Sequence, residues 1–460
     1  MLLDKACTDW LGSTPVFYNE VTGAISHSIN DVIDYGNIEI DPEGLRNYLR
    51  FGYSVFGHTM VKNVHFLECC STIEHDGLGR VKITKNDDDF ERVYSPGKNN
   101  SKEIFDRICE EVEKKIECFD GEIVLPLSGG NDSKLLAYSA KDNRKVSTYS
   151  YGLSANQRDS FEVVRACQVA EKCGLKWECI ELDSFLKDEY LSEWYRIYGS
   201  SVHLHGMYQM EYYNKILGER RKVNENPSNM LLLSGIIGDA WAGAVRIPPI
   251  NNVNDLKVLG YTHGMSIEDD ICLLKSGNNL QEQFWETKAH ELEDENVRIV
   301  YSMRIKLMLL NYLMRTPREK GFSVWSPFLN PEIAIGMLNL DWKEKEHRVW
   351  QNREFEKLGL NFGWQKSKCD YNIVLDIETL RKCRVAPLDE SVLREVIKPE
   401  FVADVNRQLA RNPLKVIPAK PRTVQNMYNK FVKKYNSRIN EALIRYEILS
   451  PVERLLKCRR

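Results

Sequence analysis

The chain has 460 residues, of which 43% are hydrophobic and 28% charged, and its formal net charge is −3. This length allows two or three domains, and the composition is that of a soluble globular protein. The slightly acidic balance argues against non-specific nucleic-acid binding as the main activity. The most apolar window, residues 230–245, is interrupted by Asp239 and is too short for a span of about 20 residues, so we expect no membrane span.

The cysteines and the N-terminus both indicate a reducing compartment. The twelve cysteines include no Cys-x-x-Cys pair, and the first residues lack a basic region followed by an apolar core. We therefore expect reduced thiols in a cytoplasmic protein, rather than a disulfide or zinc framework.

Residues 1–97 are predicted to form a small α+β N-terminal domain. Its expected strands are residues 16–18, 37–40 and 80–84. A helix should begin at Pro42, with Asp41 as its N-cap. The turn-forming stretch 95–101 ends this segment, which leaves residues 98–460 as a second domain.

In the second domain, apolar strands alternate with amphipathic helices. The expected strands are residues 123–127, 145–151, 176–182 and 230–233, and the expected helices between and around them are residues 101–119, 134–140, 161–173 and 190–217. This alternation predicts an α/β fold with a doubly wound, mostly parallel sheet, whose ligands lie at the carboxyl ends of the strands. From residue 251 the periodicity is helical. It includes a basic loop at 364–368 and a basic amphipathic tail at 420–460, for which a solvated face is favoured over partner binding.

The first strand of this domain runs into a glycine turn that is suited to binding an anion. The turn reads Leu127-Ser128-Gly129-Gly130-Asn131-Asp132-Ser133. Its glycines let backbone N–H groups approach an oxyanion, and the dipole of the following helix favours negative charge. Asp132 would repel a phosphate unless Mg²⁺ lies between them. The alternative is a tight turn that binds nothing, which the full Ser-Gly-Gly-x-Asp-Ser pattern disfavours.

A second apolar strand, residues 230–233, repeats this pattern. It ends at Ser234-Gly235, and Asp239 then stands alone in a glycine-rich turn. Because the carboxyl ends of parallel strands share one edge of a sheet, Asp239 could complete the Mg²⁺ shell that Asp132 begins.

His203 and His205 lie in the aromatic-rich helical stretch 190–217. On a helix, two residues in an i, i+2 relation diverge by about 200°, so this pair is disfavoured as a metal site. On position alone, we predict that His203, His205 and Tyr208 form a wall of the substrate pocket.

Taken together, four motifs resemble those of the asparagine synthetase family, which belongs to the N-type ATP pyrophosphatases with a PP-loop. They are residues 128–133, residues 149–153 with Tyr151 and Gly152, residues 233–243 with Ser234 and Gly235, and residues 326–330. The resemblance covers about residues 123–353. It implies an adenine nucleotide alpha-hydrolase-like synthetase domain that binds ATP and Mg²⁺. In that domain, residues 127–133, Tyr151, Gly152, Ser234 and Gly235 would contact the nucleotide.

The resemblance also implies a catalytic cation. The chain departs from the family's pattern at two positions. Lys345 or Arg348 would contact the phosphates. The family's glutaminase has a nucleophilic Cys at position two, where this chain has Leu2. Residues 1–97 therefore resemble a truncated, degenerate glutaminase-like domain without glutamine hydrolysis. The family often has a Glu at the position of Ile236, so another base or another nucleophile is implied.

The predicted function is an amide ligase that adenylates a small-molecule carboxylate and transfers it to ammonia or an amine, forming AMP and pyrophosphate. The sequence leaves three points undecided: the identity of the carboxylate, whether a separate protein supplies the nitrogen, and whether the chain forms a homodimer. Two alternatives remain. One is a PP-loop transferase that modifies tRNA, against which the absence of paired cysteines and a basic surface counts. The other is an inactive scaffold, which the missing Cys and Glu favour and intact Asp132, Ser133 and Asp239 oppose.

Overall fold

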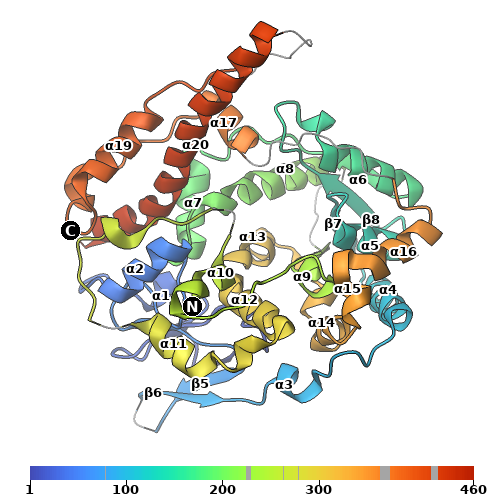
Figure 1. The fold of residues 1–460 in the computed structure, drawn as a ribbon, viewed down its shortest axis with the longest axis horizontal. Coiled ribbons are helices and arrows are strands. Elements are labelled where there is room, and N and C mark those ends of the chain that lie inside the picture. The colour runs from blue at the N-terminus through green and yellow to red at the C-terminus, as the bar shows by residue number, and fades with distance from the viewer. Residues whose placement is uncertain are drawn as a thin grey trace.

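The computed structural model describes residues 1–77, 79–223, 229–262, 264–277, 279–362, 373–415 and 423–459. Its largest sheet within these ranges has five strands. Its strand order is β11-β10-β7-β8-β9, and every neighbouring pair is parallel. The strands are β7 (Glu122–Pro126), β8 (Val146–Ser150), β9 (Lys176–Cys179), β10 (Met230–Leu233) and β11 (Ser323–Trp325). The predicted α/β class with a parallel sheet is confirmed (Figure 1).

Helices cover both faces of this sheet, because successive side chains of a strand point to opposite faces. Ile123 and Leu125 belong to a core that includes helices α4, α5, α6 and α14. Val124 between them belongs to a second core, which includes α7 and α8. These helices are α4 (Ser101–Cys118), α5 (Asn131–Ser139), α6 (Phe161–Lys172), α7 (Asp188–Tyr198), α8 (Tyr208–Val223) and α14 (Pro331–Leu338).

Most elements of the sheet region match their prediction, and the edge strand β11 is the one that sequence reasoning missed. The predicted apolar face of α4, spaced by four residues, is buried, and Asn100 caps the helix. The stretch 190–217 divides into α7 and α8 at Gly199, whose φ is 54°. β11 has three residues, all at least partly exposed, so it carries no apolar run that marks a strand.

Residues 1–97 form two small antiparallel sheets and three helices. The sheet orders are β1-β5-β6 and β3-β2-β4. The elements are β1 (Lys5–Cys7), β2 (Phe17–Asn19), β3 (Ile25–Ser26), α1 (Ile29–Val32), α2 (Pro42–Phe51), β4 (Val64–Phe66), β5 (Ser71–His75), β6 (Val81–Lys85) and α3 (Asp89–Val93). The Asp41 carboxylate caps α2 by accepting the N–H groups of Glu43 and Gly44, as predicted. The strand predicted at 37–40 is wrong, because a turn occupies its start and only Ile40 pairs, in one bridge with Val61.

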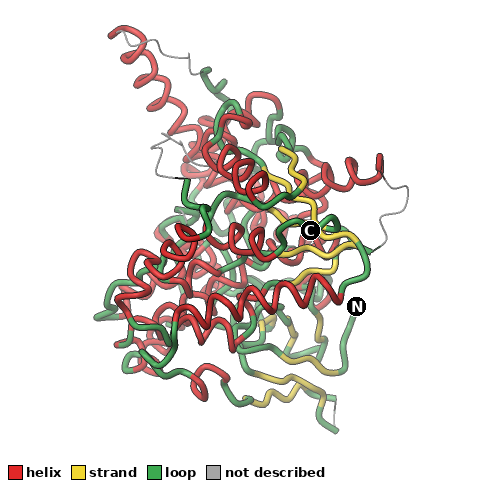
Figure 2. Tube along the Cα trace, turned by 90° about the vertical axis from the view of Figure 1, so that its right-hand side faces the viewer, coloured by secondary structure: helices red, strands yellow, loops and turns green. Residues whose placement is uncertain are grey.

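The N-terminal segment packs against distant parts of the chain. Tyr48 is fully buried and donates a hydrogen bond of 3.1 Å to the carbonyl of Ile448 in α20 (Thr423–Cys458). The Trp10 ring lies 5.6 Å from the ring of Trp241 in α9 (Gly238–Ala242). Figures 1 and 2 show that the first part of α20 extends away from the rest of the molecule.

The remaining α-helices come between α9 and α20 in the chain order. They are α10 (Lys257–Gly260), α11 (Leu280–Lys288), α12 (Glu295–Leu310), α13 (Tyr312–Glu319), α15 (Trp342–Lys345), α16 (Val349–Lys357), α17 (Ile373–Lys382), α18 (Glu390–Leu393) and α19 (Pro399–Leu409).

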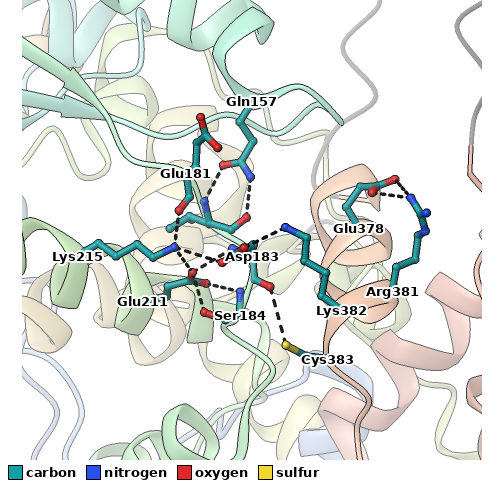
Figure 3. A network of polar contacts seen from close by, with 11 residues as sticks. Gln157, Glu181, Asp183, Ser184, Glu211, Lys215, Glu378, Arg381, Lys382 and Cys383 are labelled. Carbon is teal, nitrogen blue, oxygen red and sulfur yellow. Dashed lines mark hydrogen bonds and ion pairs between the residues drawn. The ribbon is translucent and has the colours of Figure 1, made fainter.

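A polar network joins the segment after β9 to α8 and α17 (Figure 3). Glu211 of α8 is fully buried and accepts the N–H groups of Asp183 and Ser184, at 3.0 and 2.9 Å, and the ammonium of Lys215 at 2.6 Å. Asp183 also pairs with Lys382 of α17 at 2.9 Å. A buried carboxylate needs several such partners, so this network fixes the position of α17 against the sheet domain.

The structure also bears on two general expectations, which concern membrane helices and cysteines. Within the described ranges, no helix is long and apolar enough to cross a membrane. The eleven cysteines in those ranges are free thiols. The predicted basic loop at 364–368 lies outside the described residues.

Candidate functional site

The first loop connects β7 to α5 and contains two glycines, Gly129 and Gly130. Gly129 has a φ of 67°, and a Cβ there would lie 2.4 Å from the Cβ of Arg165 in α6. Gly130 is the N-cap of α5 and offers no side chain to its first turn. The N–H groups at the start of α5 therefore have no capping side chain, which suits them to bind an anion.

Two hydroxyl groups hold this loop in shape. The backbone N–H of Ser128 donates to Ser133 Oγ at 3.2 Å, and the two Oγ atoms lie 3.1 Å apart. Ser133 Oγ also donates to the carbonyl of Gly130 at 3.2 Å. Asn131 points outward and donates to Asn352 Oδ1 of α16 at 3.2 Å, so α16 lies beside the loop.

The second loop connects β10 to α9 and presses against the first. A Cβ on Gly238 would lie 2.8 Å from Asp132 Cγ, and one on Gly235 would lie 3.3 Å from Asp132 Cβ. Ile237 between them has a φ of 55°, which is costly for a β-branched residue. Strain of this kind persists where the surrounding structure imposes it, and here it brings α9 and Asp239 next to Asp132.

Asp132 and Asp239 thus meet at the carboxyl edge of the sheet. The backbone N–H of Asp239 is directed at the Asp132 carboxylate, while Asp132 Oδ1 is buried without a hydrogen-bond partner in the described residues. Burial and then the charge of Asp239 raise the pKa of Asp132 to about 8, and Arg348 opposes this rise. An orphaned carboxylate oxygen beside a second carboxylate fits a divalent cation.

This donor set fits Mg²⁺ in particular. The described residues contain no group of three or more acidic, His or Cys side chains placed to hold a metal. Mg²⁺ commonly takes one or two carboxylates together with the phosphates of a substrate. Asp132 and Asp239 would be those carboxylates.

A cavity of about 710 Å³ opens beside the two carboxylates. It is lined by the first loop (Leu127, Ser128, Gly130, Asp132, Ser133), the end of β8 (Tyr149, Ser150, Tyr151, Leu153), α8 (Gln209, Tyr212, Tyr213) and the second loop (Ser234, Gly235, Ile236, Ile237, Asp239), among other residues. Gly152 stands just behind this wall, since a Cβ there would lie 2.1 Å from the carbonyl of Gln157. The cavity is therefore anionic at one end and mostly aromatic and aliphatic elsewhere.

The two predicted cations occupy different positions. Lys345 is 2% exposed, and its ammonium donates to Asn296 Oδ1 at 2.7 Å and to the carbonyl of Leu338 at 2.8 Å. Lys345 does not line the cavity, because it ends α15 with its side chain turned into the core. Arg348 does not line the cavity either, but it is partly exposed, has a φ of 58°, and acts electrostatically on both Asp132 and Lys134. It forms no ion pair with the described residues.

The predicted substrate wall lies one layer outside the cavity. His203 is fully buried, and His203, His205 and Tyr208 do not line the cavity. The Tyr208 ring packs 5.5 Å from the ring of Tyr151, which does line it. In the break before α8, His205 faces α20, where its Nδ1 lies 3.9 Å from Glu447 Oε2. The His203 ring instead packs against Gly52 at the end of α2.

Sequence reasoning missed Lys306 and the pair Tyr212 and Tyr213. Lys306 lies on α12, partly buried; burial lowers its pKa, and Asp239 opposes that shift. It has no hydrogen bond or ion pair with the described residues. A lysine within the otherwise apolar run 305–310 was the available signal, because a buried charge needs a partner.

Comparisons with known proteins add little to this geometry. No protein-family model matches the chain, and no curated protein matches it. Among solved structures, the chain is similar to the NH3-dependent NAD synthetase from Campylobacter jejuni subsp. jejuni NCTC 11168 in complex with the nitrate ion. That likeness has 16% identity and a TM-score of 0.25, and it covers 45% of this chain and 93% of that one.

A second solved structure is the glutamine-dependent NAD+ synthetase from Acinetobacter baumannii in complex with adenosine diphosphate. It is 16% identical with a TM-score of 0.23, and the likeness covers 53% of this chain and 41% of that one. The likeness thus spans less than half the length of the second protein. Both TM-scores are too low for either likeness to assign a fold or a role to this chain.

Proposed function

We propose that this chain is an ATP-dependent carbon–nitrogen ligase of the PP-loop type. It would adenylate a substrate carboxylate, release pyrophosphate, and pass the acyl group to ammonia or an amine with release of AMP. The observation that supports this most is the meeting of Asp132 and Asp239 beside the uncapped start of α5 and a cavity of about 710 Å³. A site with this composition suits a nucleotide with bound Mg²⁺.

The finer parts of the proposal rest on the sequence motifs. We relate residues 98–460 to the synthetase domain of the asparagine synthetase family, and residues 1–97 to a degenerate glutaminase-like domain. Nitrogen would then come from free ammonia, an amine or a separate protein. The working compartment would be the cytoplasm.

The loop residues, Mg²⁺ and Arg348 would hold the nucleotide. The N–H groups of residues 128–133 would bind its phosphates, and the Ser128 and Ser133 hydroxyls would add donors. Asp132 and Asp239 would hold Mg²⁺, which would neutralise phosphate charge in the transition state. Arg348, whose charge acts on Asp132, would stabilise the leaving pyrophosphate, while Lys345 would serve the fold.

In the first reaction, a carboxylate oxygen of the substrate attacks the α-phosphorus of ATP. The bond from the α-phosphorus to the bridging oxygen breaks, and pyrophosphate leaves with the electron pair. Lys306, whose pKa responds to the charge of Asp239, would bind the substrate carboxylate or the departing charge. Preorganised cations and N–H groups of this kind act on charge that develops in the transition state.

In the second reaction, the amine nitrogen attacks the acyl carbon, and the bond from that carbon to the AMP oxygen breaks. AMP leaves with the electron pair, and the nitrogen loses a proton to solvent. Ile236 lines the cavity where the family often has a Glu, so the second loop supplies no base at this position. Ile236, Ile237 and Tyr213 would instead exclude water, which protects an acyl-adenylate from hydrolysis.

ATP–pyrophosphate exchange by the purified full chain tests this function. We expect exchange with one member of a panel of carboxylates, in the presence of Mg²⁺, and AMP rather than ADP as the product when an amine is added. Asp132→Asn should abolish the exchange. Asp120→Asn, at an exposed position remote from the loops, should leave it unchanged. Absence of exchange together with absence of ATP binding would contradict the proposal and favour a scaffold.

A further inference from the structure

Most polar side chains in the wall of the cavity beside Asp132 have partners within the protein. The Tyr212 hydroxyl donates to the carbonyl of Tyr149 at 2.9 Å. The Tyr151 hydroxyl shares a hydrogen bond with that of Tyr208, in the layer behind the wall. Hydroxyl groups engaged in this way hold the wall in shape, and they leave little hydrogen-bonding capacity for a ligand.

Gln209 and Tyr213 differ from these residues. They lie four positions apart on α8, so their side chains leave the same face of that helix. Both line the cavity, and they are 4% and 2% exposed. In the part of the chain that the structure describes, neither the Gln209 amide nor the Tyr213 hydroxyl has a hydrogen-bond partner. Their polar atoms are not sealed in the core, so they open onto the cavity, where a ligand can supply the partner.

The rings of Tyr212 and Tyr213 point to different sides of the cavity. The Tyr212 ring lies 5.1 Å from the ring of Tyr151, at the end of β8. The Tyr213 ring lies 5.7 Å from the ring of Phe322, directly before β11. In the sheet, β8 and β11 lie on opposite sides of β7 and β10. The adenosine would lie on the β8 side, against Tyr151 and Gly152, which leaves the side of Tyr213 and the second loop for the acyl substrate.

This second side of the cavity is apolar apart from Gln209 and Tyr213. Ile236 and Ile237 of the second loop and Leu313 of α13 line it. Among the described residues, no lysine, arginine or histidine lines the cavity. An α-amino acid would carry an ammonium group and a second carboxylate into this wall without groups of opposite charge to receive them, which is costly in a buried site.

We propose that Gln209 and Tyr213 determine the specificity of the ligase, and that its substrate is a monocarboxylic acid with an apolar body and a hydroxyl group. This assignment rests on the ligase function proposed above. The reacting carboxylate would meet Lys306, and the apolar body would pack on Ile236 and Ile237. The hydroxyl would lie between the Gln209 amide and the Tyr213 phenol. Both of these groups donate and accept hydrogen bonds, as a hydroxyl does, so the three groups match.

Calorimetric titration of the full chain with Mg²⁺ and α,β-methylene-ATP present tests this substrate class without turnover. The probes are hydroxybenzoate, hydroxyphenylacetate, hydroxyphenylpropionate and hydroxydecanoate, each paired with the acid that lacks the hydroxyl, together with aspartate and glutamate. We expect at least one hydroxylated acid to bind at least about tenfold more tightly than its counterpart, because a site built for a hydroxyl rejects the analogue without it. Neither amino acid should bind.

The outcomes separate this assignment from the ligase function. Binding of aspartate or glutamate, equal affinities within every pair, or no binding of any acid would overturn the assignment. Each of these results would leave the ligase function in place as long as α,β-methylene-ATP binds. A chain that does not bind α,β-methylene-ATP would overturn the ligase function, and the assignment with it.

Tyr213→Phe and Gln209→Leu test the two residues. Each variant removes a buried polar group that has no partner in the described structure, so the urea midpoint of unfolding should stay the same or rise. Each should reduce the preference for the hydroxylated acid by about threefold to tenfold. Tyr212→Phe is the matched control and should keep the ratio of the two affinities, because its hydroxyl already binds the carbonyl of Tyr149. An unchanged ratio in both test variants, or a lowered urea midpoint, would overturn the roles of Gln209 and Tyr213.

Discussion

Gly238 shows how closely the two loops fit, and its substitution gives a prediction at the scale of one residue. An alanine Cβ there would lie 2.8 Å from Asp132 Cγ and must displace that carboxylate. The same Cβ would lie 2.9 Å from the buried Phe328 ring, so the variant should lose about 1–3 kcal/mol of stability. Pyrophosphate exchange by its folded fraction should fall by about 100-fold, the cost of a small misplacement in a site. The control is Gly218→Ala on the exposed face of α8, where a Cβ meets nothing within 4 Å. Equal losses in both variants would contradict this fit.

Arg348 and Lys345 should differ in kind when each is replaced by methionine. Arg348→Met should lower the rate of exchange by about 100-fold, since it removes a cation that acts on the site. Lys345→Met leaves Asn296 Oδ1 and the carbonyl of Leu338 without their donor. It should therefore cost about 1–3 kcal/mol in free energy of unfolding, with little effect on exchange by the folded fraction. Steady-state kinetics and urea unfolding of both variants separate the two roles. The reverse pattern would assign the phosphate contact to Lys345.

At the scale of single residues, the sequence was sufficient to predict the motif residues but not the directions in which side chains point. Asp132 and Asp239 follow apolar strands, so their meeting at one edge could be predicted from the order of elements. Lys345 and Arg348 are only three positions apart. The positive φ angles of His347 and Arg348 turn the backbone between them, so that their side chains lie in different environments. The wall of His203, His205 and Tyr208 was predicted on position alone. Gly199 marks the break after α7, but no local signal gives the direction in which the side chains beyond it point.

At the scale of secondary-structure elements, a buried acid pair joins α17 to α20. Asp376 is 7% exposed and Glu447 is 3% exposed. Burial raises the pKa of Asp376 to about 7, and burial together with Asp376 raises the pKa of Glu447 well above its ordinary value. The folded chain therefore keeps protons that the unfolded chain releases near pH 4, and this stabilisation is lost as the pH rises through about 7.

The expected result is a free energy of unfolding that falls between about pH 4 and pH 7, by about 1.4 kcal/mol per pH unit for each such carboxyl group. Glu447→Gln should make this dependence shallower, because a neutral amide has no proton to lose. Urea unfolding at several pH values measures it. An unchanged slope in Glu447→Gln would show that the pair does not titrate in this way.

Elements with long local signals were predictable, and those that depend on distant partners were not. The helix α4 and the strands β7, β8, β9 and β10 each carry a periodicity within a few residues. The strand β1 pairs with β5, and β10 pairs with β11, across long sequence separations and over three residues each. Such short strands acquire their conformation from the partner, so residues 37–40 could be taken for a strand while β11 was missed.

At the scale of the whole molecule, one sheet edge gathers residues from widely separated parts of the chain. The first loop follows β7, the second follows β10, and Arg348 arrives with α16 from beyond β11. The central claim is that this edge binds ATP with Mg²⁺ through Asp132 and Asp239. A bound nucleotide at 100 times its dissociation constant would also stabilise the fold by about 2.7 kcal/mol.

Titration calorimetry of ATP with and without Mg²⁺, on the full chain and on Asp132→Asn, tests that claim most directly. We predict Mg²⁺-dependent binding to the natural chain, and a loss of at least about tenfold in Asp132→Asn, because even supporting residues of metal sites commonly cost that much. Asp120→Asn should bind like the natural chain. Binding by Asp132→Asn that equals that of the natural chain, or no binding to either, would contradict the assignment of this site.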